Sequence, residues 1–138
     1  MVTQLTHLNW AGIGLAFFAY FVLGALWFTV LFNKSYRVSL GRPGETLPNS
    51  PIFILGPAIC SFLITLASAI LMELLNISDY ADALLFTGIV GIGFLFANTV
   101  NIAINPNMPR PLHYGMISGA YHLVGIGLAN TILVAMQS

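Results

Sequence analysis

Residues 9–32 read NWAGIGLAFFAYFVLGALWFTVLF and carry no charged side chain. A helix needs about 20 mostly apolar residues to cross the hydrocarbon core of a bilayer, so this stretch predicts a transmembrane helix. Three more stretches share its length and apolar character: residues 51–75, 80–104 and 112–136. All four are too long for buried strands and lack the alternation of strands. The sequence therefore predicts an all-α integral membrane bundle of four transmembrane helices, in a single membrane domain over residues 1–138.

The composition supports a membrane protein and excludes several other classes. Hydrophobic residues make up 58% of the chain and charged residues 6%, against about a quarter charged in an average soluble domain. Eight charged side chains cannot cover a globule, which excludes a soluble monomer. They also cannot form the basic patch that a nucleic-acid partner requires. The single cysteine, Cys60, excludes an internal disulfide and a multi-cysteine zinc site.

The connections between the spans contain residues that break or cap helices. Residues 33–50 include Gly41, Pro43, Gly44 and Pro48 and predict a polar loop. Ser50, which precedes a proline, is expected to cap the second span. Residues 76–79 predict a tight turn in which Asp79 caps the third span, with Asp82 three residues later. Residues 105–111 contain three prolines and predict a rigid turn.

The basic residues predict the orientation. They lie in two connections on the same side, at Lys34, Arg37, Arg42 and Arg110. The positive-inside rule makes both connections cytoplasmic and both termini external. We expect the chain to lie in the cell membrane. We expect Trp10 and Trp27 to lie in the interfacial aromatic belts, and Lys34 and Arg37 to reach lipid phosphates.

Polar and small residues indicate how the third and fourth spans meet. Asn98 and Asn101 lie three residues apart, so they share one face of the third helix. Gly115 and Gly119 form a G-x-x-x-G motif in the fourth, and Ser118 shares that face. Because small residues allow close helix contact, we expect the two helices to pack along this seam. The amides would then face Ser118 and the backbone of the fourth helix.

His122 is the one histidine deep within a predicted span, about 15 Å from the start of the fourth helix. At this depth the other spans offer Ser61, Thr65 and Tyr20, so a polar track through Asn101, Asn98 and His122 is predicted. One hypothesis is that this interior binds or passes a small solute or ion, because ionisable groups at this depth are functional by default. The alternative is a structural or regulatory subunit in which these groups only hold the helices together.

A second stripe predicts association between copies of the chain. Gly12, Ala16, Tyr20 and Gly24 follow one another at four-residue steps along the first span. Small residues at this spacing allow two helices to cross closely, so we expect a homo-oligomer formed through this face.

An intramembrane enzyme is the third hypothesis and has the least support. It would need an acid, a base or a metal near His122, and no carboxylate falls at mid-span. We therefore predict no catalytic residue, no metal ligand and no cofactor.

Two groups of residues resemble a known family. They comprise Asn9-Trp10 with residues 24–28 (GALWF) and 31–34 (LFNK), and Arg110-Pro111 with residues 119–122 (GAYH). Together they are similar to the bacterial membrane family called domain of unknown function 1761, over nearly the whole chain. Phe28 stands where that family more often has tyrosine. The resemblance implies a bacterial protein with four membrane helices, and it supplies no reaction and no catalytic residue.

Overall fold

The computed structural model describes residues 2–137 and contains no strand among them, while residues 1 and 138 lie outside that part of the chain. Four helical segments are long and apolar enough to cross a membrane: Trp10–Leu31, Ile52–Leu74, Tyr80–Ala103 and Pro111–Ala135. Each predicted end of a span lies within one residue of the observed end. The predicted all-α bundle of four transmembrane helices is therefore confirmed, and the chain is a multi-pass membrane protein.

Two of the four segments change from α-helix to π-helix along their length. The elements in chain order are η1 (Val2–His7, 3₁₀), α1 (Trp10–Leu26), η2 (Trp27–Leu31, π), α2 (Asn33–Ser39), α3 (Ile52–Leu74), α4 (Tyr80–Val90), η3 (Gly91–Phe96, π), α5 (Ala97–Ala103) and α6 (Pro111–Ala135). The first span is α1 with η2, and the third is α4, η3 and α5.

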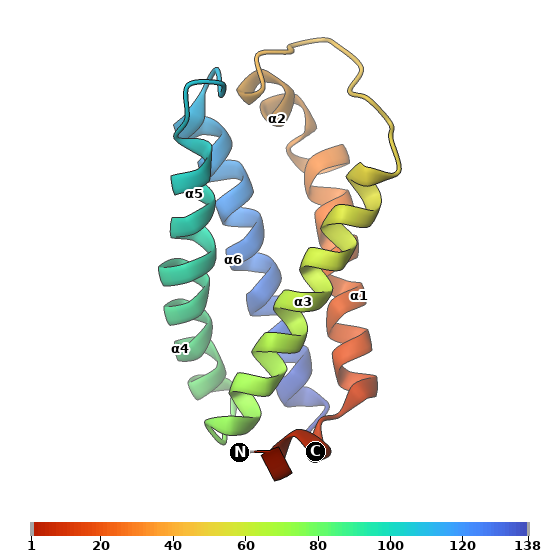
Figure 1. Cartoon of the computed structure of the whole chain (residues 1–138), viewed down its shortest axis with the longest axis vertical. Coiled ribbons are helices and arrows are strands. Elements are labelled where there is room, and N and C mark those ends of the chain that lie inside the picture. The colour runs from red at the N-terminus through yellow and green to blue at the C-terminus, as the bar shows by residue number, and fades with distance from the viewer. Residues whose placement is uncertain (1, 138) are drawn as a thin grey trace.

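Helix α6 is the centre of the bundle. It contacts α1 on one side and the α4–η3–α5 segment on the other, and α3 crosses in front of it (Figure 1). Half of its most apolar stretch is buried, against about a fifth in each of the other spans. Both chain ends lie at the same end of the bundle (Figure 1). There Asn9 joins them, because its Nδ2 donates to the carbonyl of Met136 (2.6 Å) while its Oδ1 caps α1.

The contact between α1 and α6 depends on glycines that receive aromatic rings. A Cβ atom on Gly125 of α6 would overlap the ring of Tyr20, which is fully buried. In the opposite direction, a Cβ atom on Gly24 of α1 would lie 2.7 Å from the hydroxyl oxygen of Tyr121. Each helix thus accepts an aromatic side chain of the other where it lacks a side chain of its own.

This contact corrects the prediction for the stripe on the first span. Gly12 and Ala16 are buried within the bundle, and a Cβ atom on Gly12 would lie 3.1 Å from the Cβ atom of Met136. Further along the stripe, Gly24 contacts Tyr121 and Tyr20 contacts Gly125 and His122 of the C-terminal helix of the same chain. The four-residue spacing correctly predicted a close helix contact, but the partner is α6 rather than a second copy.

The connection over residues 33–50 was predicted to be a polar loop, but part of it is helical. Its first part forms α2, because the breakers begin only at Gly41 and Tyr36 has aromatic neighbours to pack on. The Tyr36 ring lies 4.8 Å from Phe28 and 5.8 Å from Tyr114, between ring centroids. The Ser35 hydroxyl also lies 2.8 Å from Nε2 of His113 on α6.

The predicted caps had different outcomes. Asp79 accepts a hydrogen bond from the backbone N–H of Asp82 (3.0 Å), so the cap of α4 is confirmed. Ser50 was predicted wrongly, because α3 begins one residue later and its capping position is Pro51, with no side-chain hydrogen bond. Residues 105–111 form the expected turn, in which Asn105 Oδ1 accepts from the backbone N–H of Asn107.

We predict that Gly125→Ala destabilises the bundle while Gly14→Ala does not. The added methyl group at position 125 would collide with the Tyr20 ring, whereas at position 14 it would meet no atom within 4 Å. Overpacking of this kind lowers the apparent Tm by about 5 °C or more. The control should keep or slightly raise the Tm, because alanine favours helix over glycine. Equal Tm values for the two variants in detergent would contradict the packing described above.

Candidate functional site

The α1–α6 contact places a tyrosine and a histidine together in the middle of the bundle. The hydroxyl oxygen of Tyr20 lies 2.8 Å from Nδ1 of His122, with a longer contact of 3.5 Å to the backbone carbonyl of the same residue. Tyr20 is fully buried and His122 is half-buried. The sequence suggested Tyr20 among several partners for His122, and the structure selects it.

The second ring nitrogen of His122 remains available. No hydrogen bond from residues 2–137 reaches Nε2, and this atom is not among their fully buried unpartnered polar atoms. It therefore faces accessible space. Ser118 lies one turn nearer the basic end of α6, and its hydroxyl is fully buried with no partner among the described residues. The site thus contains an imidazole nitrogen that is not fully buried and, one turn away, a buried hydroxyl, and no described residue bonds to either atom.

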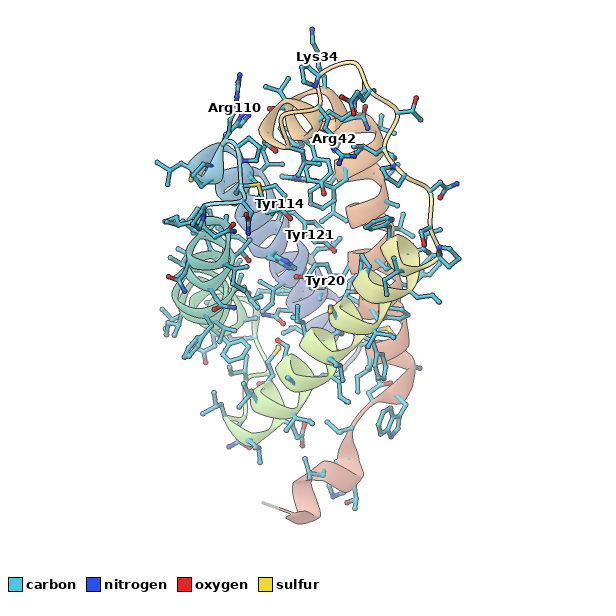
Figure 2. The ribbon with its side chains drawn as sticks, turned by 45° about the horizontal axis from the view of Figure 1, so that its top comes forward. Tyr20, Lys34, Arg42, Arg110, Tyr114 and Tyr121 are labelled. Atoms are coloured by element: carbon cyan, nitrogen blue, oxygen red, sulfur yellow. The ribbon has the colours of Figure 1, made fainter. Side chains whose placement is uncertain are left out.

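An aromatic column connects this site with the basic end of the bundle. The Tyr121 ring lies 4.8 Å from His122 and 5.2 Å from Phe28, between centroids, and the column continues through Tyr36 to Tyr114. Figure 2 shows Tyr20, Tyr121 and Tyr114 in succession toward the end at which Lys34, Arg42 and Arg110 are labelled. Burial and the neighbouring Tyr114 raise the pKa of Tyr36 to about 12, so its phenol is neutral at physiological pH.

Ser61 and Thr65 are both buried, as the predicted polar track required, but neither side chain bonds to His122. The Ser61 hydroxyl donates to the carbonyl of Pro57 (2.8 Å), and the Thr65 hydroxyl donates to that of Ser61 (2.8 Å). Both bonds stay within α3, since a hydroxyl in a helix reaches the carbonyl four residues earlier. The hydroxyls of these two residues are therefore satisfied within α3, and the hydrogen bond of the His122 ring is made by Tyr20 of α1.

Asn98 and Asn101 were expected to face the fourth helix, and this prediction is wrong. Both are exposed, and the residues that contact the glycines of α6 are instead Phe96, Val100 and Ala103. A Cβ atom on Gly119 would lie 2.7 Å from the Phe96 ring, and one on Gly115 would lie 3.2 Å from the Cα atom of Val100. The glycines of α6 therefore do admit the third span, but they meet its apolar face.

The π-helical turn explains this error. In a π-helix each N–H bonds the carbonyl five residues earlier, so a single turn displaces all later residues by about 100° around the axis. Gly91, at the start of η3, faces Leu123 and Ile126 of α6. The next residue on that face is Phe96, five positions later, rather than residue 94 or 95. Gly91 and Gly93 weaken the α-helix here, but their presence alone does not specify a π-turn.

The residues predicted at the membrane interface have different environments. Trp10 and Lys34 are exposed. Trp27 instead faces the bundle, where its indole N–H donates to the carbonyl of Ile117 on α6 (3.1 Å). Arg37 is half-buried, and its Nη1 donates to the carbonyl of Glu45 (2.8 Å). Trp27 thus joins two helices, a role that the interfacial prediction did not include.

Sequence reasoning missed Asn130, whose amide bonds to side chains of two other helices in the core. It is almost fully buried on α6, accepts from the Ser68 hydroxyl of α3 (2.5 Å) and donates to the Thr87 hydroxyl of α4 (2.8 Å). One amide thereby connects three helices. The available signal was Ser68, which follows Ser61 and Thr65 on one face of its helix and lies level with residue 130.

A metal site is not visible at His122. Within residues 2–137, no three His, Cys, Asp or Glu side chains lie close enough to hold one metal ion. The atoms presented at the site are an imidazole nitrogen and hydroxyl oxygens, which act as neutral donors and acceptors of hydrogen bonds.

The comparison with family models covers almost the whole chain. The model described as "Protein of unknown function (DUF1761)" matches residues 11–134. The chain belongs to this family. No curated protein and no solved structure matches it. In this DUF1761 member, the matched region includes all four spans except the first and last residues of the bundle, and the whole of the Tyr20–His122 site.

We predict that Asn130→Ala lowers the stability of the bundle by about 1–2 kcal/mol, because the hydroxyls of Ser68 and Thr87 lose their common partner inside the core. Thr131→Ala is the matched control, since the exposed Thr131 hydroxyl bonds only the Gly127 carbonyl of its own helix. Unfolding in detergent by a denaturant series measures both. Once Asn130 is alanine, a further Ser68→Ala change should cost less than it does alone. Full additivity would rule out the three-helix connection.

Proposed function

We propose that this membrane protein is not an enzyme and that its interior binds or passes a small polar solute or ion at the Tyr20–His122 site. The observation that carries the proposal is the accessible Nε2 of His122, near the middle of α6 and beside the hydroxyl of the fully buried Tyr20. A polar atom without a partner is costly at this depth in hydrocarbon. A solute or water at Nε2 would remove that cost.

The chemistry of the site indicates what kind of solute it suits. His122 and the buried hydroxyls of Tyr20 and Ser118 near it are donors and acceptors without a fixed charge, and no Asp, Glu, Lys or Arg occurs between residues 111 and 135. Such a set favours a small molecule that both donates and accepts hydrogen bonds over a bare cation, which carboxylates would serve better. The aromatic column from Tyr121 to Tyr114 extends from the site toward the basic end of the bundle.

A structural or regulatory subunit is the second candidate, and the Asn130 connection favours it. The side chains of Asn130 and Trp27 both form hydrogen bonds with other helices of the same chain. If the Tyr20–His122 bond serves the same purpose, any side chain that preserves one interhelical hydrogen bond would replace histidine. An intramembrane enzyme has the least support, because the site holds no carboxylate beside His122.

We also propose that the chain lies in a bacterial inner membrane with both termini external. Lys34, Arg42 and Arg110 gather at the end of the bundle opposite the termini (Figure 2, Figure 1). Under the positive-inside rule that end faces the cytoplasm.

The solute hypothesis predicts separate effects on folding and on function for His122→Asn. The amide of asparagine lies at the δ position, like Nδ1 of the imidazole, and can donate to or accept from Tyr20, so we expect a Tm close to that of the wild type. Asparagine has no atom at the position of the imidazole Nε2, so solute permeability should fall at least about tenfold, as expected for loss of a specific polar contact. The measurement is flux in proteoliposomes over a panel of neutral polyols, amides, protons and monovalent ions.

Two results would reject this function. One is a wild-type protein that raises no permeability above that of empty liposomes and binds no member of the panel. The other is a His122→Asn variant with wild-type flux, which would favour the structural candidate. Tyr80→Phe serves as the control variant, because it removes an exposed hydroxyl at the end of the bundle where the termini lie, away from His122.

The orientation predicts which loop an impermeant thiol reagent can reach in intact cells. In a Cys60→Ala background, Ser78→Cys should react from outside, because it lies in the connection on the side of the termini. Thr46→Cys, in the exposed connection after α2, should react only after the membrane is permeabilised. The reverse pattern would place the termini in the cytoplasm.

A further inference from the structure

The outward face of α5 carries two amides that the chain itself does not satisfy. Asn98 and Asn101 are exposed, and no hydrogen bond from residues 2–137 reaches either side chain. They lie within the third membrane-spanning segment, which extends to Ala103. The opposite face of α5 is occupied, because Val100 and Ala103 contact Gly115 of α6. The two amides therefore point away from the bundle.

Other polar side chains on the outside of the spans behave differently. The hydroxyls of Thr29, Thr99 and Thr131 each donate to the carbonyl four residues earlier, at 2.5, 2.7 and 2.8 Å. A hydroxyl satisfied in this way can face acyl chains at little cost. A primary amide has two donor hydrogens and an acceptor oxygen, and it has no equivalent means of satisfying all of them within its own helix.

The depth of Asn98 makes this a real cost. It lies five residues before the end of its span, or about 7.5 Å along the helix axis. An asparagine side chain is too short to reach the headgroups from there, unlike lysine or arginine. Asn101 lies one turn nearer the interface on the same side of the helix. Something other than lipid must cover this face if the amides are to be satisfied.

We infer that a second copy of this chain covers it, α5 against α5, around a twofold axis along the membrane normal. Copies of one membrane protein insert with the same orientation, so the same residues lie at the same depth. An amide is both donor and acceptor, so Asn98 and Asn101 of one copy complement those of the other. A different protein would need matching polar groups at the same two depths, whereas a second copy has them by construction.

The shape of this face fits close contact between helices. Gly93 and Ala97 are four residues apart, and a Cβ atom on Gly93 would meet nothing within 4 Å. They belong to a shallow, open hollow whose lining is Gly93, Phe94, Leu95, Ala97, Asn98 and Asn101. Small residues beside interhelical amides are the combination that drives helices together in lipid. The surface is independent of the Tyr20–His122 site, so either proposal can fail without the other.

Disulfide trapping in native membranes tests the surface without altering the amides. In a Cys60→Ala background, Ala97→Cys should form an oxidised homodimer, because two copies in contact bring these positions within reach of a disulfide. Ile59→Cys is the matched control: it is exposed on α3 and lies at a similar depth from the same end of the bundle. We expect efficient trapping at position 97 and little at position 59.

A second measurement removes the amides. The double change Asn98→Leu with Asn101→Leu should raise the dissociation constant of the dimer in mild detergent at least about tenfold, while Thr29→Leu on η2 should leave it unchanged. The proposal is overturned if the full chain remains monomeric and is not trapped at position 97. It is also overturned if position 59 is trapped as efficiently, or if position 97 is joined to a different protein.

Discussion

The close approach of neighbouring helices to α6 depends on glycine residues of α6, which have no side chain at the points of contact. Gly125 leaves room for the Tyr20 ring, Gly119 for the Phe96 ring and Gly115 for the backbone at Val100. Lipid chains are as apolar as a leucine side chain, so burial of apolar surface does little to bring the helices together. Van der Waals contact at short range and a few interhelical hydrogen bonds supply the attraction, and both require the backbones to come close. The Tyr20–His122 bond is a direct consequence, because a bulkier residue at position 125 would displace the tyrosine.

The polar side chains of the interior then separate into two groups. Asn130 and Trp27 have hydrogen bonds to other helices and hold these helices together, while the Ser61 and Thr65 hydroxyls are satisfied within α3. His122 and Ser118 retain an unsatisfied atom in the core, and Asn98 and Asn101 retain unsatisfied amides on the surface. In water this difference would mean little, but in hydrocarbon each unsatisfied group costs several kcal/mol in principle. A solute would therefore bind at His122 in the core, and a second copy of the chain would bind at Asn98 and Asn101 on the surface.

The sequence predicted those features that depend on local chemistry. Apolar length defined the four spans, aspartate defined the cap of α4, and proline defined the turn over residues 105–111. It also predicted that Gly115 and Gly119 form a contact and that Tyr20 is a candidate partner of His122. The rest required three-dimensional information. The four-residue stripe on α1 indicates a close contact but does not identify the helix that makes it. The π-turn at Gly91–Phe96 rotates everything after it, so a face assigned with uniform α-helical spacing placed Asn98 and Asn101 on the wrong side.

The central claim is that Tyr20 lies in the space left by Gly125 and bonds His122 when the protein is in a bilayer. Magic-angle-spinning NMR on isotopically labelled protein in lipid measures this directly, through correlations across space between the Tyr20 ring and the Cα atom of Gly125. The account predicts a strong cross-peak between them, together with one from the Tyr20 ring to the His122 ring. A Tyr20 ring that shows no contact with either residue and correlates with lipid acyl chains instead would contradict it.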